Sequence, residues 1–105
     1  MKYPVLHDFL SLSKPLKQKI DAIFLFGSRA RHDEKPDSDY DLLVIVGEDF
    51  SLADKDALYD RVMDILLKTG NILSLKIFKK ADFEKLRRLH TPFTERVMRE
   101  RVKVG

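Results

Sequence analysis

The chain has 105 residues, the size of a single domain with one hydrophobic core, so we expect one domain over residues 1–105. Hydrophobic residues make up 44% and charged residues 35% of the sequence, and this balance excludes an intrinsically disordered chain. The net charge of +3, from 20 basic and 17 acidic residues, is too small to indicate nucleic-acid binding, and the absence of cysteine excludes disulfides and thiolate metal sites.

The N-terminal residues Met1 to His7 lack the apolar core of a signal peptide, and no apolar run reaches the ~20 residues of a membrane span. We therefore expect a cytoplasmic protein with no membrane partner. Apolar residues recur at helical spacing from Val5 to Leu12, and Pro15 favours a second short helix from Leu16 to Ile20. These two helices are expected to cover one face of a sheet.

The stretch from Ile23 to Val46 carries the strongest pattern in the sequence. Its first four residues, Ile23 to Phe26, are all apolar, which predicts a buried strand. Gly27 and Ser28 end this strand, and a turn of this kind leaves backbone N–H groups free to face an anion. The sequence therefore predicts a phosphate site at the end of the first strand.

Two aspartates open the next apolar run. Asp39 and Asp41 lie two positions apart and precede Leu42 to Val46, so both carboxylates project from one face of the sheet if they begin that strand. Like charges this close repel each other unless a cation lies between them, and Mg²⁺ prefers oxygen ligands. We predict a Mg²⁺ site here, with an exposed turn as the alternative. Tyr40 points to the opposite face and is expected to pack in the core.

The loop after Gly27-Ser28 is basic at its start, with Arg29 and Arg31. Arg29 is predicted to contact phosphate, because an arginine can fork onto two phosphate oxygens. Two alternatives stay open for this residue: a solvated turn, and an ion pair with Asp33 or Glu34.

The second half of the chain predicts further helices and a third strand. Ser51 and Asp54 indicate a helix N-terminus, and the helix continues to about Lys68, with Asp56, Asp60 and Asp64 on a solvated acidic face. Residues 72–78 predict the third strand, in which Ser74 and Lys76 take polar positions on one of the two faces. Two more helices are expected, from Ala81 to Leu89 and from Phe93 through Met98.

These residues carry a resemblance to a known family. Gly27-Ser28, followed after a short loop by Asp39-Tyr40-Asp41, resembles the G-S…D-x-D signature of the minimal nucleotidyltransferase domains of the polymerase β superfamily. Residues 38–44 match the usual S-D-x-D-L-x-V, and the resemblance covers roughly residues 5 to 104. It implies an α/β fold: a small mixed sheet of three or four strands with helices packed mainly on one side.

The resemblance also implies a chemistry. In that family the Gly-Ser turn holds the triphosphate of a nucleoside triphosphate, which assigns Gly27 and Ser28 to nucleotide binding beside Arg29, whose phosphate contact is predicted from its side-chain chemistry. The D-x-D aspartates bind metal, which makes Asp39 and Asp41 the expected catalytic and Mg²⁺-binding residues. The implied reaction transfers a nucleoside monophosphate, with ATP as the first candidate donor, to a hydroxyl. Domains of this size resemble the antitoxin-like partners of HEPN proteins, so a HEPN-type partner is an implied acceptor.

The sequence departs from the family pattern at two places. His32 stands where related sequences commonly have glycine. The third strand, where the family places a third carboxylate, has none, and Ser74 and Lys76 occupy its polar positions. Two functions therefore stay open: a nucleotidyltransferase, and a catalytically weak or inactive module that binds a nucleotide or a partner protein. A nucleic-acid-binding domain is disfavoured by the charge balance.

Overall fold

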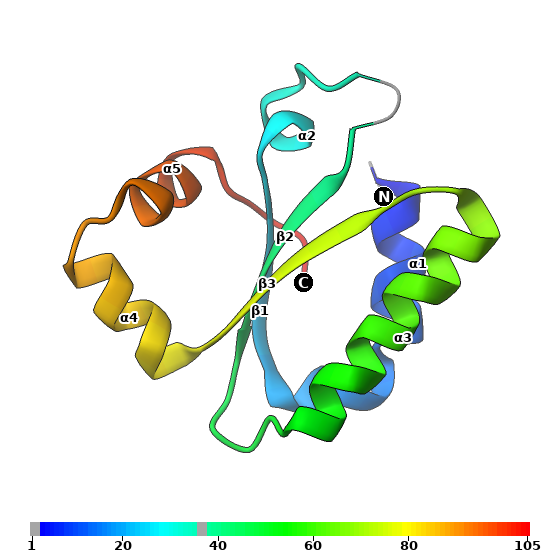
Figure 1. Cartoon of the computed structure of the whole chain (residues 1–105), viewed down its shortest axis with the longest axis horizontal. Coiled ribbons are helices and arrows are strands. Elements are labelled where there is room, and N and C mark those ends of the chain that lie inside the picture. The colour runs from blue at the N-terminus through cyan, green and yellow to red at the C-terminus, as the bar shows by residue number, and fades with distance from the viewer. Residues whose placement is uncertain (1–2, 36–37) are drawn as a thin grey trace.

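The computed structural model describes residues 3–35 and 38–105. The helices and strands follow in this order (Figure 1): α1 (Pro4–Leu12), the 3₁₀ helix η1 (Lys14–Lys19), β1 (Ile20–Phe26), α2 (Ser28–Arg31), β2 (Tyr40–Val46), α3 (Leu52–Thr69), β3 (Leu73–Lys79), α4 (Lys80–Arg88), α5 (Pro92–Glu100) and β4 (Val102–Lys103). All the helices and strands predicted from the sequence are present. The sequence prediction lacks α2 and β4, because four and two residues are too few to show a periodic pattern.

The four strands form one mixed sheet in the order β3-β2-β1-β4. β1 runs antiparallel to β2 and to β4, while β2 runs parallel to β3. A parallel pair needs a long crossover connection, which the 18 residues of α3 supply. The predicted α/β fold with a small mixed sheet is therefore confirmed.

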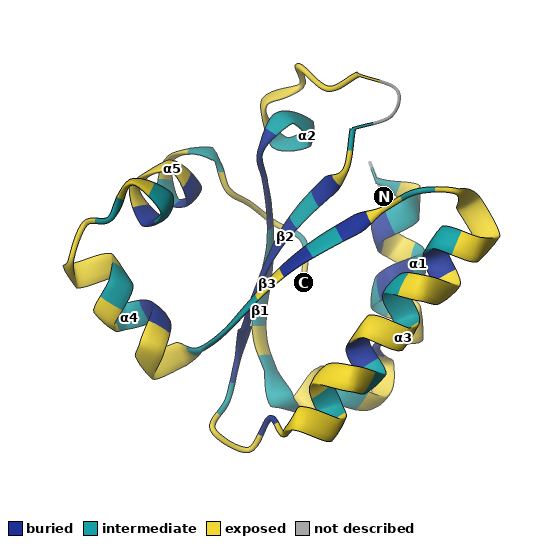
Figure 2. Cartoon of the chain, viewed as in Figure 1, coloured by how far each residue is buried: buried dark blue, intermediate teal, exposed yellow. Residues whose placement is uncertain are grey.

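Helices cover both faces of this sheet (Figures 1 and 2). Leu42 and Val44 of β2 belong to a core that also contains buried residues of α1 and α3. Leu43 and Ile45, which alternate with them, belong to a second core with buried residues of α4 and α5. The two cores correct the expectation that the helices pack mainly on one side of the sheet. The C-terminal helices α4 and α5 bury their own apolar residues against the second face.

The helix boundaries follow their local chemistry. Ser51 and Asp54 form the predicted capping box at the start of α3, and Gly70 ends the helix with φ +77°, a conformation that glycine adopts without strain. The three aspartates of the predicted acidic face, Asp56, Asp60 and Asp64, are all exposed. Within residues 3–35 and 38–105, the helices are too short or too polar to cross a membrane.

Candidate active site

The backbone at Gly27 lies at the centre of the candidate site. It follows β1 with φ +78°, in the left-handed region that glycine favours, and its carbonyl accepts hydrogen bonds from the N–H groups of Ala30 and Arg31, each at 3.1 Å. A Cβ at this position would collide with the carboxylate of Asp41, whose Cγ would lie only 3.2 Å away. The turn is therefore held directly against the Asp41 side chain. This close approach requires glycine.

Asp41 lies at the second position of β2, between two neighbouring strands. It is paired with Phe26 of β1 on one side and with Ser74 of β3 on the other. Its pKa is raised above the ordinary value, first by burial and then by the negative charge of Asp39. Asp39 is exposed and lies just before the start of β2. The structure thus brings the two predicted aspartates and the Gly27 turn together at one end of the sheet.

Three cations partly offset the raised pKa of Asp41. In order of effect they are Arg96, Lys76 and Arg31, from α5, β3 and α2 respectively. Sequence analysis does not assign Arg96 to the site, because a charged residue within an amphipathic helix reads as a surface position. Only the packing of α5 over the second face of the sheet brings its guanidinium near Asp41.

The register of β3 settles which of its faces is turned to the site. Ser74 is paired with Asp41 and Lys76 with Leu43, and residues paired in this way point to the same side of the sheet. Leu73 and Leu75 point the other way, into the core shared with α1 and α3. Ser74 therefore occupies the position beside Asp41 where a third carboxylate would lie. Lys76 follows one step along the same face.

Ser28 and Arg29 both belong to α2. Ser28 is partly buried, and its carbonyl accepts a hydrogen bond from the N–H of Asp33 at 3.1 Å. The guanidinium of Arg29 donates two hydrogen bonds to the carbonyl of Ser38, at 2.9 and 3.2 Å, and lies 4.2 Å from the centre of the Tyr40 ring. Arg29 thus ties the two ends of the loop together. Its predicted contact with phosphate stays a prediction.

Tyr40 itself is buried in the core that α1 and α3 cover, which confirms its predicted packing role. His32, the residue that departs from the family pattern, has φ +63°, in the left-handed region. This conformation gives a physical reason for glycine in related sequences, since glycine has no Cβ to strain there.

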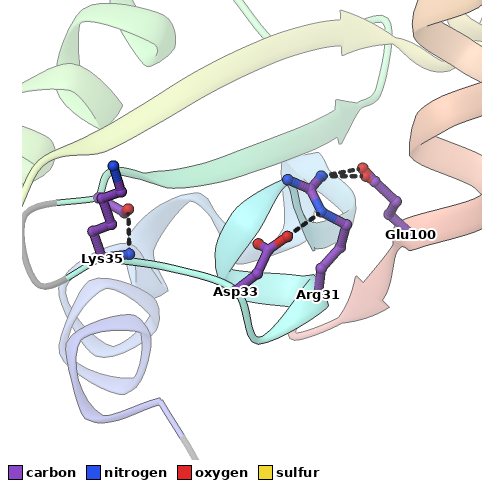
Figure 3. A network of polar contacts seen from close by, with 5 residues as sticks. Arg31, Asp33, Lys35 and Glu100 are labelled. Atoms are coloured by element: carbon purple, nitrogen blue, oxygen red, sulfur yellow. Dashed lines mark hydrogen bonds and ion pairs between the residues drawn. The ribbon is translucent and has the colours of Figure 1, made fainter.

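Arg31 links the loop to the far end of the chain (Figure 3). Its guanidinium donates to both carboxylate oxygens of Glu100, at 2.7 and 2.8 Å, and to Asp33 at 3.1 Å. These two carboxylates, Asp33 first, raise the pKa of Arg31. Glu100 ends α5, and its side chain is only 6% exposed. Arg31 therefore forms ion pairs with Asp33 in the loop and with Glu100, which is 69 residues away in the sequence.

The residues present fit one divalent cation. Burial and the neighbouring charge of Asp39 disfavour ionisation of Asp41, and a cation between the two carboxylates would relieve that cost. The described residues offer no group of three acidic or histidine side chains placed to share a metal ion. Further ligands would therefore come from phosphate oxygens or water, as is common for Mg²⁺.

The Gly27 turn against Asp41, on a mixed sheet, fits the nucleotidyltransferase resemblance found in the sequence. The family model described as "Polymerase beta, Nucleotidyltransferase" matches residues 11–104. The chain belongs to this family.

Comparisons with individual proteins agree with this family assignment. A protein of Methanocaldococcus jannaschii, named "Putative protein adenylyltransferase MJ0141", is 38% identical over 69 residues, which are 66% of this chain and 70% of the relative. Among solved structures, spectinomycin adenyltransferase AAD(9) from Enterococcus faecialis, crystallised with ATP and spectinomycin, superposes with a TM-score of 0.73 at 18% identity, over 98% of this chain and 55% of that one.

A second solved structure, described as a toxin-antitoxin with AMP-PNP, superposes with a TM-score of 0.56 at 16% identity, over 95% of this chain and 69% of that one. At these identities the two structures show a shared fold alone. The chain spans about half the length of the spectinomycin enzyme, 55%.

Proposed function

We propose that this chain is a nucleotidyltransferase domain that transfers a nucleoside monophosphate, from ATP first of all, to a hydroxyl on another protein. The observation that carries the proposal is the contact of the Gly27 turn with Asp41, because it puts a phosphate-binding turn beside a pair of carboxylates. Family membership supports the reaction, and the name of the M. jannaschii relative supports a protein acceptor.

Each residue has a defined task in this reaction. Asp39 and Asp41 would hold one or two Mg²⁺, which would supply positive charge at the α-phosphate and favour activation of the acceptor oxygen. The Gly27 backbone and the Ser28 hydroxyl hold the phosphates that depart as pyrophosphate. Lys76 and Arg96 lie near Asp41 and add positive charge where negative charge develops in the transition state. A HEPN-type protein is the first candidate acceptor by family resemblance.

One observation favours a second candidate function. Ser74 takes the position of a third carboxylate, and Lys76 brings a positive charge to the same face. A domain with this arrangement binds Mg²⁺ mainly through the phosphates of its nucleotide, so transfer is slow or absent. The alternative is thus a module that keeps nucleotide or partner binding without efficient transfer.

The experiment that tests the binding site is a thermal melt with and without Mg²⁺ and a non-hydrolysable ATP analogue. A ligand that binds only the folded state raises the melting temperature by mass action. We expect Mg²⁺ and the analogue together to raise it for the wild type and not for the Asp39→Asn/Asp41→Asn variant. An equal rise in both proteins would remove these aspartates from the site.

A further inference from the structure

Positive charge is concentrated at the end of the chain. Residues 76–105 contain ten lysines and arginines but only four acidic residues, whereas residues 1–75 contain ten basic and 13 acidic residues. The net charge of +3 is therefore the sum of an acidic part, residues 1–75, and a strongly basic part, residues 76–105. The last part forms α4, α5, β4 and most of β3, so the basic residues belong to the elements on and around the second face of the sheet.

Five of these cations belong to β3, α5 and the residues that follow α5, and we refer to them as the basic face: Lys76, Arg96, Arg99, Arg101 and Lys103. All five are exposed. The guanidinium of Arg96 lies 5.8 Å from the centre of the Phe26 ring, and that of Arg101 lies 5.1 Å from the centre of the Phe24 ring. Lys103 is paired with Phe24 across β1 and β4, which places its side chain on the same face. The basic face thus extends across the sheet from β3 to β4.

The basic face is continuous with the candidate active site. Lys76 lies two residues beyond Ser74, which is paired with Asp41, and the guanidinium of Arg96 lies over the ring of Phe26, which is also paired with Asp41. Arg99 lies one helical turn from Arg96 on α5. In the described part of the chain, none of the five forms an ion pair with a carboxylate. Their charges are therefore available to a partner. Because Lys76 and Arg96 lie beside strand neighbours of Asp41, we assign them to the nucleotide and assign Arg99, Arg101 and Lys103 to the acceptor.

We propose that the basic face docks the acceptor through an acidic segment of that protein, next to the hydroxyl that receives the nucleotide. This inference rests on the proposed function and adds the chemistry that recognises the acceptor. A protein segment fits better than a nucleic acid, because Phe26 is buried and the guanidinium groups of Arg101 and Arg96 lie over the Phe24 and Phe26 rings, where a base would have to stack. Complementary charge of this kind guides association and fixes the orientation of the partner.

The test uses a fluorescent random copolymer of glutamate and tyrosine, which offers both acidic residues and hydroxyls. Its binding is measured by anisotropy at about 0.1 M salt, where charges more than about 10 Å apart are largely screened. The variant is Arg99→Glu/Lys103→Glu, which spares the residues near Asp41. The matched control is Lys14→Glu/Lys55→Glu, which makes the same change of charge at exposed residues of η1 and α3. Circular dichroism checks that all proteins are folded.

We expect the copolymer to bind the Arg99→Glu/Lys103→Glu variant about tenfold more weakly than the wild type, and the control less than twofold more weakly. An equal loss in variant and control would mean that net charge alone drives binding and would overturn the proposal. Binding of a single-stranded RNA oligonucleotide in preference to the copolymer would overturn it as well.

Failure of docking and failure of the proposed function give different results. The Asp39→Asn/Asp41→Asn variant should bind the copolymer as tightly as the wild type does, because these residues act on the nucleotide. If labelled ATP modifies an uncharged tyrosine copolymer as well as the acidic one, transfer stands and acidic docking is overturned. If the acidic copolymer binds at the basic face but is never modified, docking stands and the proposed transfer is contradicted.

Discussion

At the scale of single residues, the site depends on one contact between backbone and side chain. Gly27 has a positive φ, and the Asp41 carboxylate fills the space where a Cβ would lie. Two aspartates near each other and a glycine after an apolar strand could be predicted from the sequence. The direct contact between Gly27 and Asp41 could not be predicted, because it depends on the antiparallel register that pairs Phe26 with Asp41.

Gly27→Ala tests this contact. The substitution forces a strained φ on alanine and pushes its Cβ into Asp41, so we expect a loss of about 1–3 kcal/mol of unfolding free energy. Because the carboxylate must move, we also expect the Mg²⁺-dependent binding of an ATP analogue to fall at least about tenfold. Urea unfolding and calorimetric titration measure the two effects. Gly70→Ala is the control: its φ is also positive, though its left-handed helical conformation strains alanine less, and its Cβ meets nothing within 4 Å, so nucleotide binding should be unaffected.

The raised pKa of Asp41 predicts how stability depends on pH. In the unfolded chain this carboxyl titrates near 3.8, and in the folded protein it titrates higher, chiefly because it is buried. The folded state therefore gains stability from protonated Asp41 at low pH and loses that stability as the pH rises through the raised pKa. We expect Asp41→Asn to raise the melting temperature at neutral pH without metal, and this gain to shrink as the pH falls.

Melting curves over a pH series measure this effect, with Asp60→Asn as the control because Asp60 is an exposed carboxylate on α3. The control should change the melting temperature little at any pH. A lower melting temperature for Asp41→Asn at neutral pH would show that the folded protein favours the charged carboxylate.

Ser74→Asp tests the missing third carboxylate. Ser74 is paired with Asp41 on the same face, so a carboxylate there adds a ligand and an attractive charge for a cation. We expect Mg²⁺ to bind the variant at least about tenfold more tightly than the wild type in calorimetry without nucleotide. Ser74→Asn has nearly the same shape without the charge and should leave the affinity unchanged. Equal Mg²⁺ affinity in Ser74→Asp and wild type would show that β3 does not serve the metal.

At the scale of elements, the ion pair between Arg31 and Glu100 connects the loop after β1 to the end of α5. Glu100→Gln removes the charge that holds Arg31, so we expect faster amide hydrogen exchange in α2 and residues 32–35. Glu95→Gln is the control, because the partner of Glu95 is His90, outside this loop. Equal exchange of the loop in wild type and Glu100→Gln would show that the pair does not order it.

The same scale shows how much of the structure the sequence predicts. A period of 3.6 residues is sufficient for α1 and α3, continuous apolar runs predict β1 and β2, and alternation predicts β3. The Ser51–Asp54 capping box marks the start of α3. The sequence alone does not show which face of β3 is turned toward the aspartates, because Ser74 and Lys76 alternate with apolar residues. That face is decided by the pairing of Ser74 with Asp41 across separate strands. The positions of Arg96 and Glu100 depend in the same way on how α5 packs.

At the scale of the whole molecule, the helices on the two faces of the sheet form two separate cores. α1 and α3 bury one face in a core that includes Leu6, Leu42 and Leu58. α4 and α5 cover the other face, where the Asp41 side chain lies among the cations of α5 and β3. A domain of this size needs a large buried core for stability, and the proposed site lies at the edge of the second core.

The central claim is the transfer of a nucleoside monophosphate from ATP to a protein hydroxyl. It is tested most directly by supplying ATP labelled at the α-phosphate or at the γ-phosphate to the protein with Mg²⁺ and a co-expressed partner protein. We expect the α-label, and not the γ-label, to become attached to the partner, and we expect Asp39→Asn/Asp41→Asn to abolish this attachment. No attachment of the α-label, or attachment that persists in that variant, would contradict the central claim.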